Sequence, residues 1–355
     1  MLFFILLFFT SCEGSVNLND MSIIQAMGID YVGGKFILTL HEFSVNESKE
    51  KSESFENLII KAEGKTIYEA IKNAEAKDGK MAFYSQCEVF VISKNAALNN
   101  MEGILAFFNS NFKIPLSASV LLSQNTAMEV LNARLFSSLV PSLSTNRIEN
   151  NMLAPEVKVI DLLRMLHNQN GSGYLPIVRT VKAEDERFDI EIKSAELFKN
   201  YKPVYTLNQN ETMGLLWLSG RVKNAMLYLN YDNKNVSINI SSKMNDISFH
   251  KKGNISGNIK INAYGSVSEM SNLGTNNTDK QKIIDVENKV AENIENQINS
   301  FLNAIKLTNC DALNFNQYLK HSGLYKFTAQ NGNLPNCTFN IDANFYIRHS
   351  TGKIK

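Results

Sequence analysis

The sequence has no excess of either charge and no long apolar run. Lys and Arg number 36 and Asp and Glu 35 among 355 residues, which gives a formal net charge of +1. A nucleic-acid-binding protein usually carries a basic excess or a basic stripe, so the composition argues against that class. A membrane-spanning helix needs about 18 consecutive apolar residues, and no stretch of that length occurs. The apolar fraction of 44% is still enough to build the cores of two or three domains.

Catalytic signatures are missing as well. No HExxH or GxSxG motif occurs, and the histidines at positions 41, 167, 250, 321 and 349 are scattered along the chain. The spacing of Gly28, Gly33 and Lys35 approaches that of a phosphate-binding loop, but no Ser or Thr follows the lysine to hold Mg²⁺. A hairpin turn at Gly33-Gly34 explains these glycines better. The sequence therefore predicts no catalytic residue, no cofactor and no metal site.

Cysteine is scarce, with four residues and no CxxC pair. Cys87 begins the run Cys87-Glu-Val-Phe-Val-Ile and is predicted to be a buried thiol on a strand. Cys310 and Cys337 are the pair that a disulfide could join, and the sequence leaves open whether they do so. Cys12 requires a different explanation because of the residues that precede it.

The N-terminus has the pattern of a bacterial lipoprotein signal. Leu2 to Phe9 form an unbroken apolar run of eight residues, which suits a signal peptide and is too short to cross a bilayer. The small residues Thr10 and Ser11 follow, and then Cys12. This order resembles the lipobox, in which the cysteine thiol receives a diacylglycerol and becomes the mature N-terminus. We predict lipidation of Cys12 and export of the chain; the lack of Lys or Arg before the run leaves the completeness of the N-terminus open.

The first part of the chain alternates strands and helices. Residues 22–45 are predicted to form a hairpin, and the helix that follows is capped by Thr66 with Glu69 and ended by Gly79. A strand at 86–93 and an amphipathic helix over 98–108 come next. The elements predicted beyond residue 112 are a strand at 115–123, a helix capped by Thr126 that extends to about 135, a helix at 157–166 and a strand at 177–181.

Strands dominate the last part of the chain, apart from one long helix. The predicted strands are 215–222, 225–231, 236–240 and 258–267. Trp217, in the first of them, is predicted to be a core residue. From about residue 280 an apolar stripe at spacings of three and four marks a helix of about 28 residues. Its members are Ile283, Val286, Val290, Ile294, Ile298, Phe301 and Ile305. A closing strand alternates from Phe339 to Ile347, and the helix is expected to bury its stripe across an antiparallel sheet.

These elements predict an α+β, multi-domain protein with mixed or antiparallel sheets, each packed by helices, and with the long helix against the C-terminal sheet. The predicted divisions are a signal peptide and lipobox at 1–12, an N-terminal α+β domain at 17–112, a middle α+β subdomain at 113–190, and a C-terminal domain at 192–355 made of an antiparallel sheet and the long helix. The residues themselves indicate an exported, membrane-anchored binding or assembly protein.

Several segments, in their order and spacing, resemble the Ger(x)C family, the lipoprotein C subunits of bacterial spore germinant receptors. After the lipobox comes Leu18-Asn19-Asp20, and then Gly28-Ile29-Asp30 at a strand end, although Glu13-Gly14 replaces the usual Trp-Asp. The further matching segments are Gly64 to Ala70, Glu88 to Ser93, Gly214 to Val222, Asp311 to Phe315 and Tyr346 to Gly352. The resemblance covers nearly the whole chain.

The resemblance implies a non-enzymatic protein of three α+β domains. It implies a lipid anchor on Cys12 at the outer face of the spore inner membrane, and partners in a polytopic A subunit and a transporter-like B subunit. The complex would respond to nutrients by triggering germination. Nucleic acid is not expected as a partner, and direct binding of a nutrient by this subunit stays open.

Two other classes of function remain as alternatives. An exported lipoprotein that binds a small-molecule solute would have a ligand cleft between two similar α/β lobes, but the sequence shows no regular βαβ series. A cell-wall hydrolase would need paired carboxylates or a metal set in a cleft, and no spacing singles out such residues.

Overall fold

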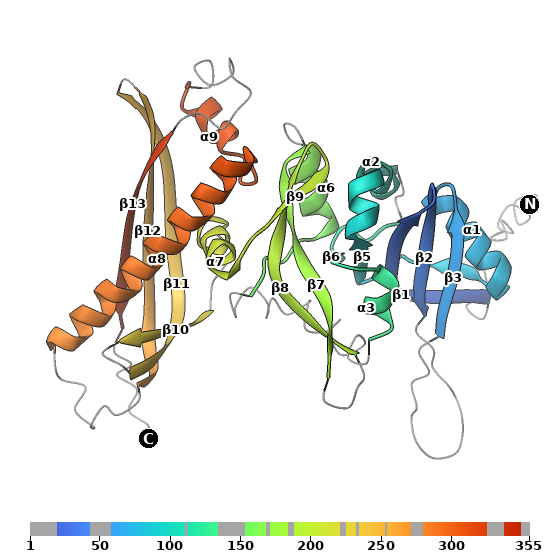
Figure 1. The fold of residues 1–355 in the computed structure, drawn as a ribbon, viewed down its shortest axis with the longest axis horizontal. Helices are drawn as coiled ribbons and strands as arrows, with labels where there is room; N and C mark the ends of the chain where they lie inside the picture. Colours follow the sequence, from blue (N-terminus) through green and yellow to red (C-terminus); the bar gives the residue numbers. More distant parts are fainter. Residues whose placement is uncertain are drawn as a thin grey trace, which may run out of the picture.

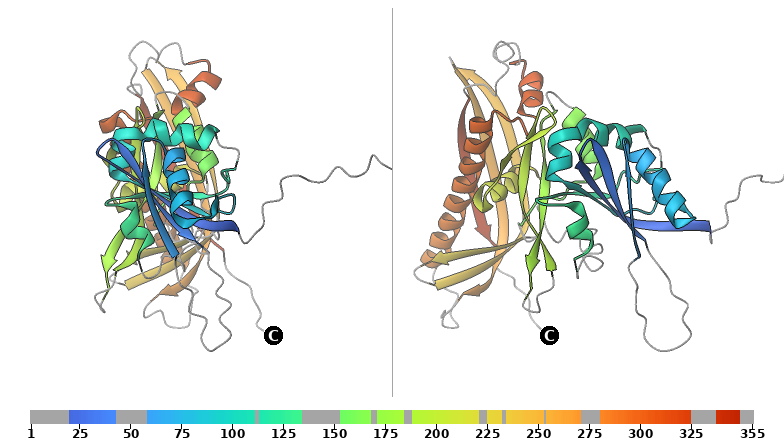
Figure 2. Two further views of the ribbon diagram at one scale, coloured as in Figure 1. Left: turned by 90° about the vertical axis from the view of Figure 1, so that its right-hand side faces the viewer. Right: turned by 45° about the vertical axis from the view of Figure 1, so that its right-hand side comes forward.

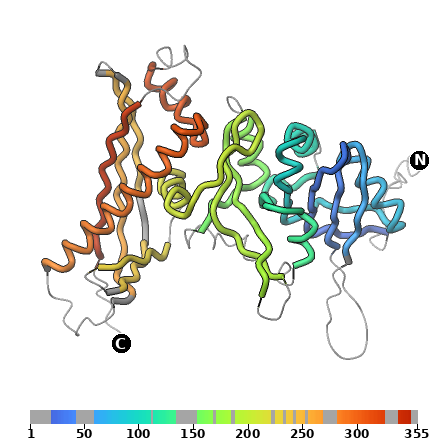
Figure 3. The backbone as a smooth tube through the Cα atoms, in the orientation of Figure 1, coloured from blue at the N-terminus to red at the C-terminus, as the bar shows by residue number. Residues whose placement is uncertain are grey.

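Two sheets follow one another along an elongated molecule, with helix α7 (Gln209–Leu218) between them (Figure 1). The computed structural model describes residues 20–42, 58–110, 113–133, 153–167, 171–183, 188–220, 225–231, 234–252, 254–270, 280–324 and 337–348. The chain completes the larger N-terminal sheet before it passes through α7 to the smaller C-terminal sheet (Figure 3). This mixed architecture of helices and sheets confirms the predicted fold class.

Nine of the described strands form the N-terminal sheet, in the order β3-β2-β1-β5-β6-β7-β8-β9 with β4 paired to β1. They are β1 (Met21–Val32), β2 (Lys35–Glu42), β3 (Leu58–Gly64), β4 (Met81–Phe83), β5 (Val89–Ser93), β6 (Ser119–Ser123), β7 (Gly173–Lys182), β8 (Phe188–Lys199) and β9 (Lys202–Thr206). The central strands β1, β5, β6 and β7 run parallel, and antiparallel pairs flank them. Every residue of β5 and β6 is buried, as expected for parallel strands covered on both faces.

Helices cover both faces of this sheet. One apolar cluster joins the sheet to α1 (Ile67–Asp78), α2 (Lys94–Ser110) and α6 (Val159–His167). A separate cluster on the other face joins it to α3 (Ala127–Leu131). Helix α2 connects β5 to β6, which pair parallel, so β5-α2-β6 is a parallel crossover. The sequence predicted these three elements but not the direction in which the two strands pair.

Local signals in this half were interpreted correctly at most positions. Gly33 and Gly34 have φ values of 59° and 80°, as a two-residue hairpin turn requires. Thr66 and Thr126 each cap a helix by accepting a hydrogen bond from the amide three residues on, and Gly79 ends α1 with φ 77°. Other details were wrong: α3 ends at Leu131 rather than near 135, and β6 is shorter than predicted. The sequence analysis did not predict β3, β4, β8 or β9.

The strands of the predicted N-terminal and middle domains share one sheet. Residues of β5 pair in register with residues of β6, for example Phe90 with Val120. The predicted start of the C-terminal domain at 192 falls inside β8, which pairs with β7 on one side and β9 on the other. The division of the chain into three domains stays a proposal.

The C-terminal sheet has four strands in the order β10-β11-β12-β13, and the long helix lies along one face (Figure 2). The elements are β10 (Ala225–Tyr231), β11 (Lys234–Lys252), β12 (Asn254–Met270), α8 (Lys280–Thr308), α9 (Phe315–His321) and β13 (Thr338–Ile347). The predicted stripe of α8 is buried from Val286 to Ile305. The prediction of a wholly antiparallel sheet was wrong, because β13 pairs parallel to β12. Helix α8 provides the crossover that a parallel pair requires.

Two glutamates of α8 protect the outer edge of β13. The amide of Ala343 donates to Glu295 Oε1 at 3.2 Å, and the amide of Ile347 donates to Glu287 Oε1 at 2.7 Å. An edge strand with unpaired N–H groups is a template for pairing with another chain. These carboxylates occupy such groups and so restrict access to this edge.

The predicted strand at 215–222 was wrong, because residues 209–218 form helix α7. Asn208 and Glu211 form a reciprocal capping box, in which each side chain accepts a hydrogen bond from the other's amide. Residues 214–218 of the helix are apolar and buried on all sides, because they are enclosed between the two halves of the molecule, so they lack the period of an amphipathic helix. Trp217 is fully buried, as predicted.

Candidate functional site

Helix α7 docks on α8 through a close contact and a buried hydrogen bond. Gly214 faces the main chain of α8, where an added Cβ would collide with the Gln297 carbonyl oxygen and lie 2.7 Å from Phe301 Cβ. Trp217 Nε1 donates to Gln297 Oε1 at 2.7 Å, and Gln297 Nε2 donates to Asn293 Oδ1 at 2.7 Å. The glycine thus permits the close approach, and the glutamine satisfies the only indole of the chain.

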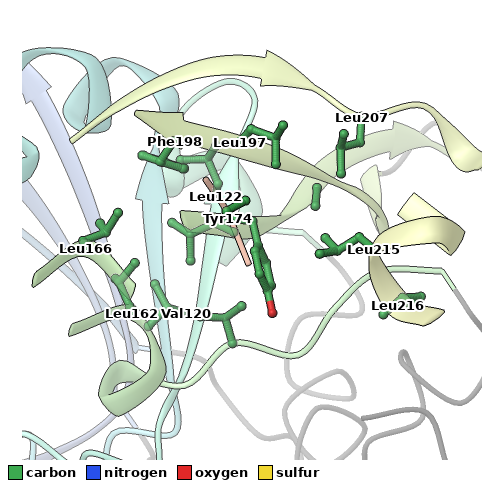
Figure 4. Close-up of a cluster of buried hydrophobic side chains, with 14 of the residues drawn as sticks. Val120, Leu122, Leu162, Leu166, Tyr174, Leu197, Phe198, Leu207, Leu215 and Leu216 are labelled. Carbon is green, nitrogen blue, oxygen red and sulfur yellow. The ribbon is translucent and has the colours of Figure 1, made fainter. Parts of the chain in front are cut away.

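The other face of α7 packs against the N-terminal sheet. Leu207, Leu215 and Leu216 belong to the same buried cluster as Tyr174 of β7 and Leu197 of β8. Figure 4 shows the Tyr174 side chain extending from β7, with Leu215 and Leu216 of α7 facing it. The core is therefore continuous from one sheet to the other through α7.

Polar contacts connect the end of α8 to β8 of the N-terminal sheet. Cys310 Sγ donates to the Phe198 carbonyl at 3.0 Å, and Lys199 Nζ donates to the Thr308 carbonyl at 3.3 Å. Asp311 then holds the start of α9, because its carboxylate accepts from the amides of Phe315 at 2.6 Å and Asn316 at 3.0 Å. Burial raises the pKa of the Asp311 carboxyl above its ordinary value, and these two hydrogen bonds partly oppose that rise.

A pocket of about 270 Å³ opens at this junction. We call it the junction pocket. Helix α6 and β7 form one wall, and the end of α7, β11 and the α8–α9 connection form the other. Its polar lining includes Asp161, Arg164, Ser172, Tyr174, Asp311 and Tyr318. Its apolar lining includes Met165, Leu218, Ile247 and Leu313.

The junction pocket could not be predicted from the sequence. Asp161 and Arg164 lie in α6, about 150 residues before Asp311, and no motif connects them. The signal that was available is the Asp311–Phe315 segment, which was noted for its resemblance to the family. The structure explains that segment as the α9 cap at one wall of the pocket.

Cys12, the predicted lipidation site, lies outside the described residues. Cys87, Cys310 and Cys337 are free and buried, so the structure pairs none of them. Burial raises the pKa of all three thiols, to about 12 for Cys310, where Asp311 adds to the effect, and to about 11 for Cys337. Cys87 lies just before β5, where its thiol donates to the Val89 carbonyl.

The Gly28-Ile29-Asp30 segment positions α3 against the sheet. A Cβ at Gly28 would lie 3.1 Å from Ala127 Cβ, so the glycine leaves room for the helix. Asp30 is buried, and its carboxylate accepts from the amides of Ala127 at 2.9 Å and Met128 at 3.2 Å. The segment that resembled a family motif therefore docks a helix.

Two family models match successive parts of the chain. The model described as "Spore germination protein N-terminal domain" matches residues 14–180, and that described as "Spore germination B3/ GerAC like, C-terminal" matches residues 193–351. The chain belongs to the Ger(x)C family of spore germination proteins. This confirms the resemblance to the C subunits of germinant receptors.

A solved structure agrees with the fold of this Ger(x)C protein. The structure described as "Crystal Structure of the GerBC protein" is similar over 91% of this chain and 97% of that chain, with a TM-score of 0.61. The sequence identity is 15%, so this likeness shows a shared fold. No curated protein matches the chain.

The described ranges contain neither a candidate membrane-spanning helix nor a candidate metal-binding cluster. No helix there is long and apolar enough to cross a membrane. The same residues contain no group of three or more His, Cys, Asp or Glu side chains arranged to hold a metal ion.

Proposed function

We propose that the chain is the lipid-anchored C subunit of a spore germinant receptor and that its role is non-enzymatic. In this proposal a diacylglycerol on Cys12 holds it at the outer face of the spore inner membrane. There it assembles with a polytopic A subunit and a transporter-like B subunit, and the complex triggers germination in response to nutrients. The observation that carries the proposal is the match of both Ger(x)C family models in a chain whose first residues read as a lipobox.

The anchor is a physical requirement of this proposal. A lipidated cysteine carries two or three acyl chains, and each buried CH₂ contributes about 0.8 kcal/mol to membrane binding. Two chains suffice for stable attachment, whereas one gives marginal binding. Loss of the Cys12 thiol should therefore release the chain from membranes that lack the other subunits.

The test fractionates dormant spores and identifies the mature N-terminus by mass spectrometry. We expect diacylglyceryl-Cys12 in the inner-membrane fraction. The variant Cys12→Ala, produced without the A and B subunits, should move to the soluble fraction. Cys337→Ala is the matched control, because it also removes one thiol but leaves the lipobox intact.

Two results would overturn parts of the proposal. Cys12→Ala protein that stays in the membrane fraction without its partners would remove the anchor. Protein confined to the supernatant of vegetative cells would contradict the receptor role. Co-purification of the tagged chain with A and B subunits from detergent-solubilised spore membranes tests the assembly directly.

A further inference from the structure

We propose that β10 pairs antiparallel with β10 of a second copy of this chain, about a two-fold axis at Tyr228. The two C-terminal sheets of four strands would then form one sheet of eight. This inference goes beyond the proposed function, because it assigns a partner to a surface that the lipid anchor and the A and B subunits do not involve. Three observations support it: the protection of the other sheet edges, the lack of charge on β10 and the symmetry of its sequence.

Strand β10 ends the C-terminal sheet with an open edge. All seven of its residues, Ala225–Tyr231, pair with β11 on one side. On the other side, no strand of the described part of the chain pairs with it (Figure 1). Within the same ranges, no side chain bonds to the main chain of residues 225–230. Such an edge is a template for another strand.

The other three end strands of the two sheets are protected. In β3, the carbonyls of Lys61 and Glu63 accept hydrogen bonds from Lys77 at 3.0 Å and Asn73 at 2.8 Å, both in α1. In β9, Pro203 has no amide to donate, and proline is a common guard of edge strands. The amides of β13 are held by the two α8 glutamates described above. Strand β10 is therefore the end strand that is most open to a partner.

The lack of charge on β10 favours a second copy as that partner. In a symmetric antiparallel pair the central residue lies opposite itself, and like charges directly opposite are destabilising. The centre of β3 is Lys61, so self-pairing there would oppose two ammonium groups. The centre of β10 is Tyr228, and none of its seven residues is charged. A copy of β10 can therefore approach without like-charge repulsion.

The sequence of β10 is nearly symmetric about its centre. Leu227 and Leu229 flank Tyr228 on either side. In the register centred on Tyr228, Leu227 lies opposite Leu229 of the second copy, and Met226 lies opposite Asn230. This register pairs all seven residues, and any shift that keeps the faces matched pairs fewer.

The two faces of the strand also match in this register, because opposite residues lie on the same face of a sheet. Leu227 is buried in the core, and Leu229 is partly buried against the same cluster. Leu227 of the second copy would cover Leu229 and extend that core. Tyr228 is 73% exposed, and it would meet Tyr228 of the second copy as a cross-strand aromatic pair.

The size of the contact sets the expected affinity. One strand of seven residues makes a small interface, and interfaces that bury less than about 1,200 Å² in total are usually weak or transient. We therefore expect a dissociation constant between about 10 and 100 μM.

The first experiment measures the mass of the full-length chain by sedimentation, in detergent with micelles in excess. Between about 1 and 200 μM the mass should rise from that of a monomer toward that of a dimer. Tyr228→Lys should remain monomeric, because two ammonium groups would meet at the axis. Met244→Lys is the matched control, because Met244 of β11 is 66% exposed and lies away from the β10 edge. The control should dimerise as the unaltered protein does.

Disulfide trapping tests the register. The Cα atoms of opposite residues in an antiparallel pair lie about 4.5–5.5 Å apart, which is within reach of a disulfide. Oxidation should therefore link Tyr228→Cys chains to one another. Met226→Cys and Asn230→Cys chains that carry tags of different mass should link to each other and not to themselves. Met244→Cys should give no more dimer than the unaltered protein, whose own cysteines set the background.

Three outcomes would overturn the proposal. One is a mass that stays monomeric up to about 200 μM. Another is a dimer that Tyr228→Lys leaves intact, which would place the contact elsewhere. The third is a Met226→Cys chain that links to itself as readily as to Asn230→Cys, which would contradict the antiparallel register. The melting temperature of Tyr228→Lys is recorded; if that variant is unfolded, the result of disulfide trapping decides.

Discussion

Gly214 of α7 lies directly against the carbonyl of Gln297 in α8, with no room for a side chain between the two helices. The contact lets α7, which also packs against the N-terminal sheet, lie close to the main chain of α8. Trp217, one turn further along α7, then donates its indole N–H to the side chain of the same glutamine. One residue of α8 thus receives both a backbone contact and a side-chain hydrogen bond from α7.

Gly214→Ala should destabilise the protein. Alanine normally stabilises a helix interior by about 1 kcal/mol relative to glycine, but here its methyl group would strike α8, and overpacking costs about 1–3 kcal/mol. We expect a lower melting temperature. Gly103→Ala in α2 is the control, because its methyl group would meet only the end of the Asn100 side chain. A melting temperature that rises in both variants would contradict the close contact.

Gln297→Leu should weaken the α7–α8 joint by about 1–3 kcal/mol, because the buried Trp217 indole N–H would lose its acceptor. Trp217 is the only tryptophan, so its fluorescence during urea unfolding reports on this joint directly. Gln281→Leu, at the exposed start of the same helix, should change stability little. Equal losses in the two variants would argue against a special role for the buried bond.

Asp30→Ala should cost about 1–3 kcal/mol of unfolding free energy, because two α3 amides would lose their acceptor in a buried position. Asp30→Asn keeps one carbonyl oxygen and should lose less. Chemical denaturation of both variants measures the difference. If both variants unfold at the denaturant concentration of the unaltered protein, the carboxylate does not hold α3.

The three buried thiols should be unreactive in the native protein at pH 8. Their pKa values are raised, so little thiolate is present, and burial blocks access. A thiol reagent should label none of them in the native state and all three in denaturant. A fourth labelled cysteine in denaturant would be Cys12, and its appearance would mean that the thiol is not lipidated.

The raised thiol pKa values also predict how stability depends on pH. The Cys310 thiol has a pKa of about 12 in the folded chain, against an ordinary value of 9.0. Its contribution to the free energy of unfolding is complete below pH 9 and declines as the pH rises from 9 toward 12, because the unfolded chain ionises first. Denaturation at pH 7.5 and pH 10.5 should show the loss, and Cys310→Ala should reduce its size.

Much of this protein could be predicted from short stretches of sequence. The hairpin at Gly33-Gly34, the helix caps at Thr66 and Thr126, and the buried stripe of α8 depend on neighbouring residues, so local patterns were sufficient. Family membership also followed from the order of the segments, and the family models confirm it. Those segments could be matched to the family from the sequence, but only the structure showed what each of them does.

Tertiary structure decided the rest, because it depends on which distant residues meet. Residues 215–218 have no helical period, since α7 is buried on nearly all sides, and their helix was mistaken for a strand. The parallel direction of β13 is set by the crossover of α8. The junction pocket joins α6 to a segment about 150 residues later, and no local pattern carries that information. The sequence by itself determined the family and the elements that have a clear local period, whereas the packing of the two halves around α7 determined the site.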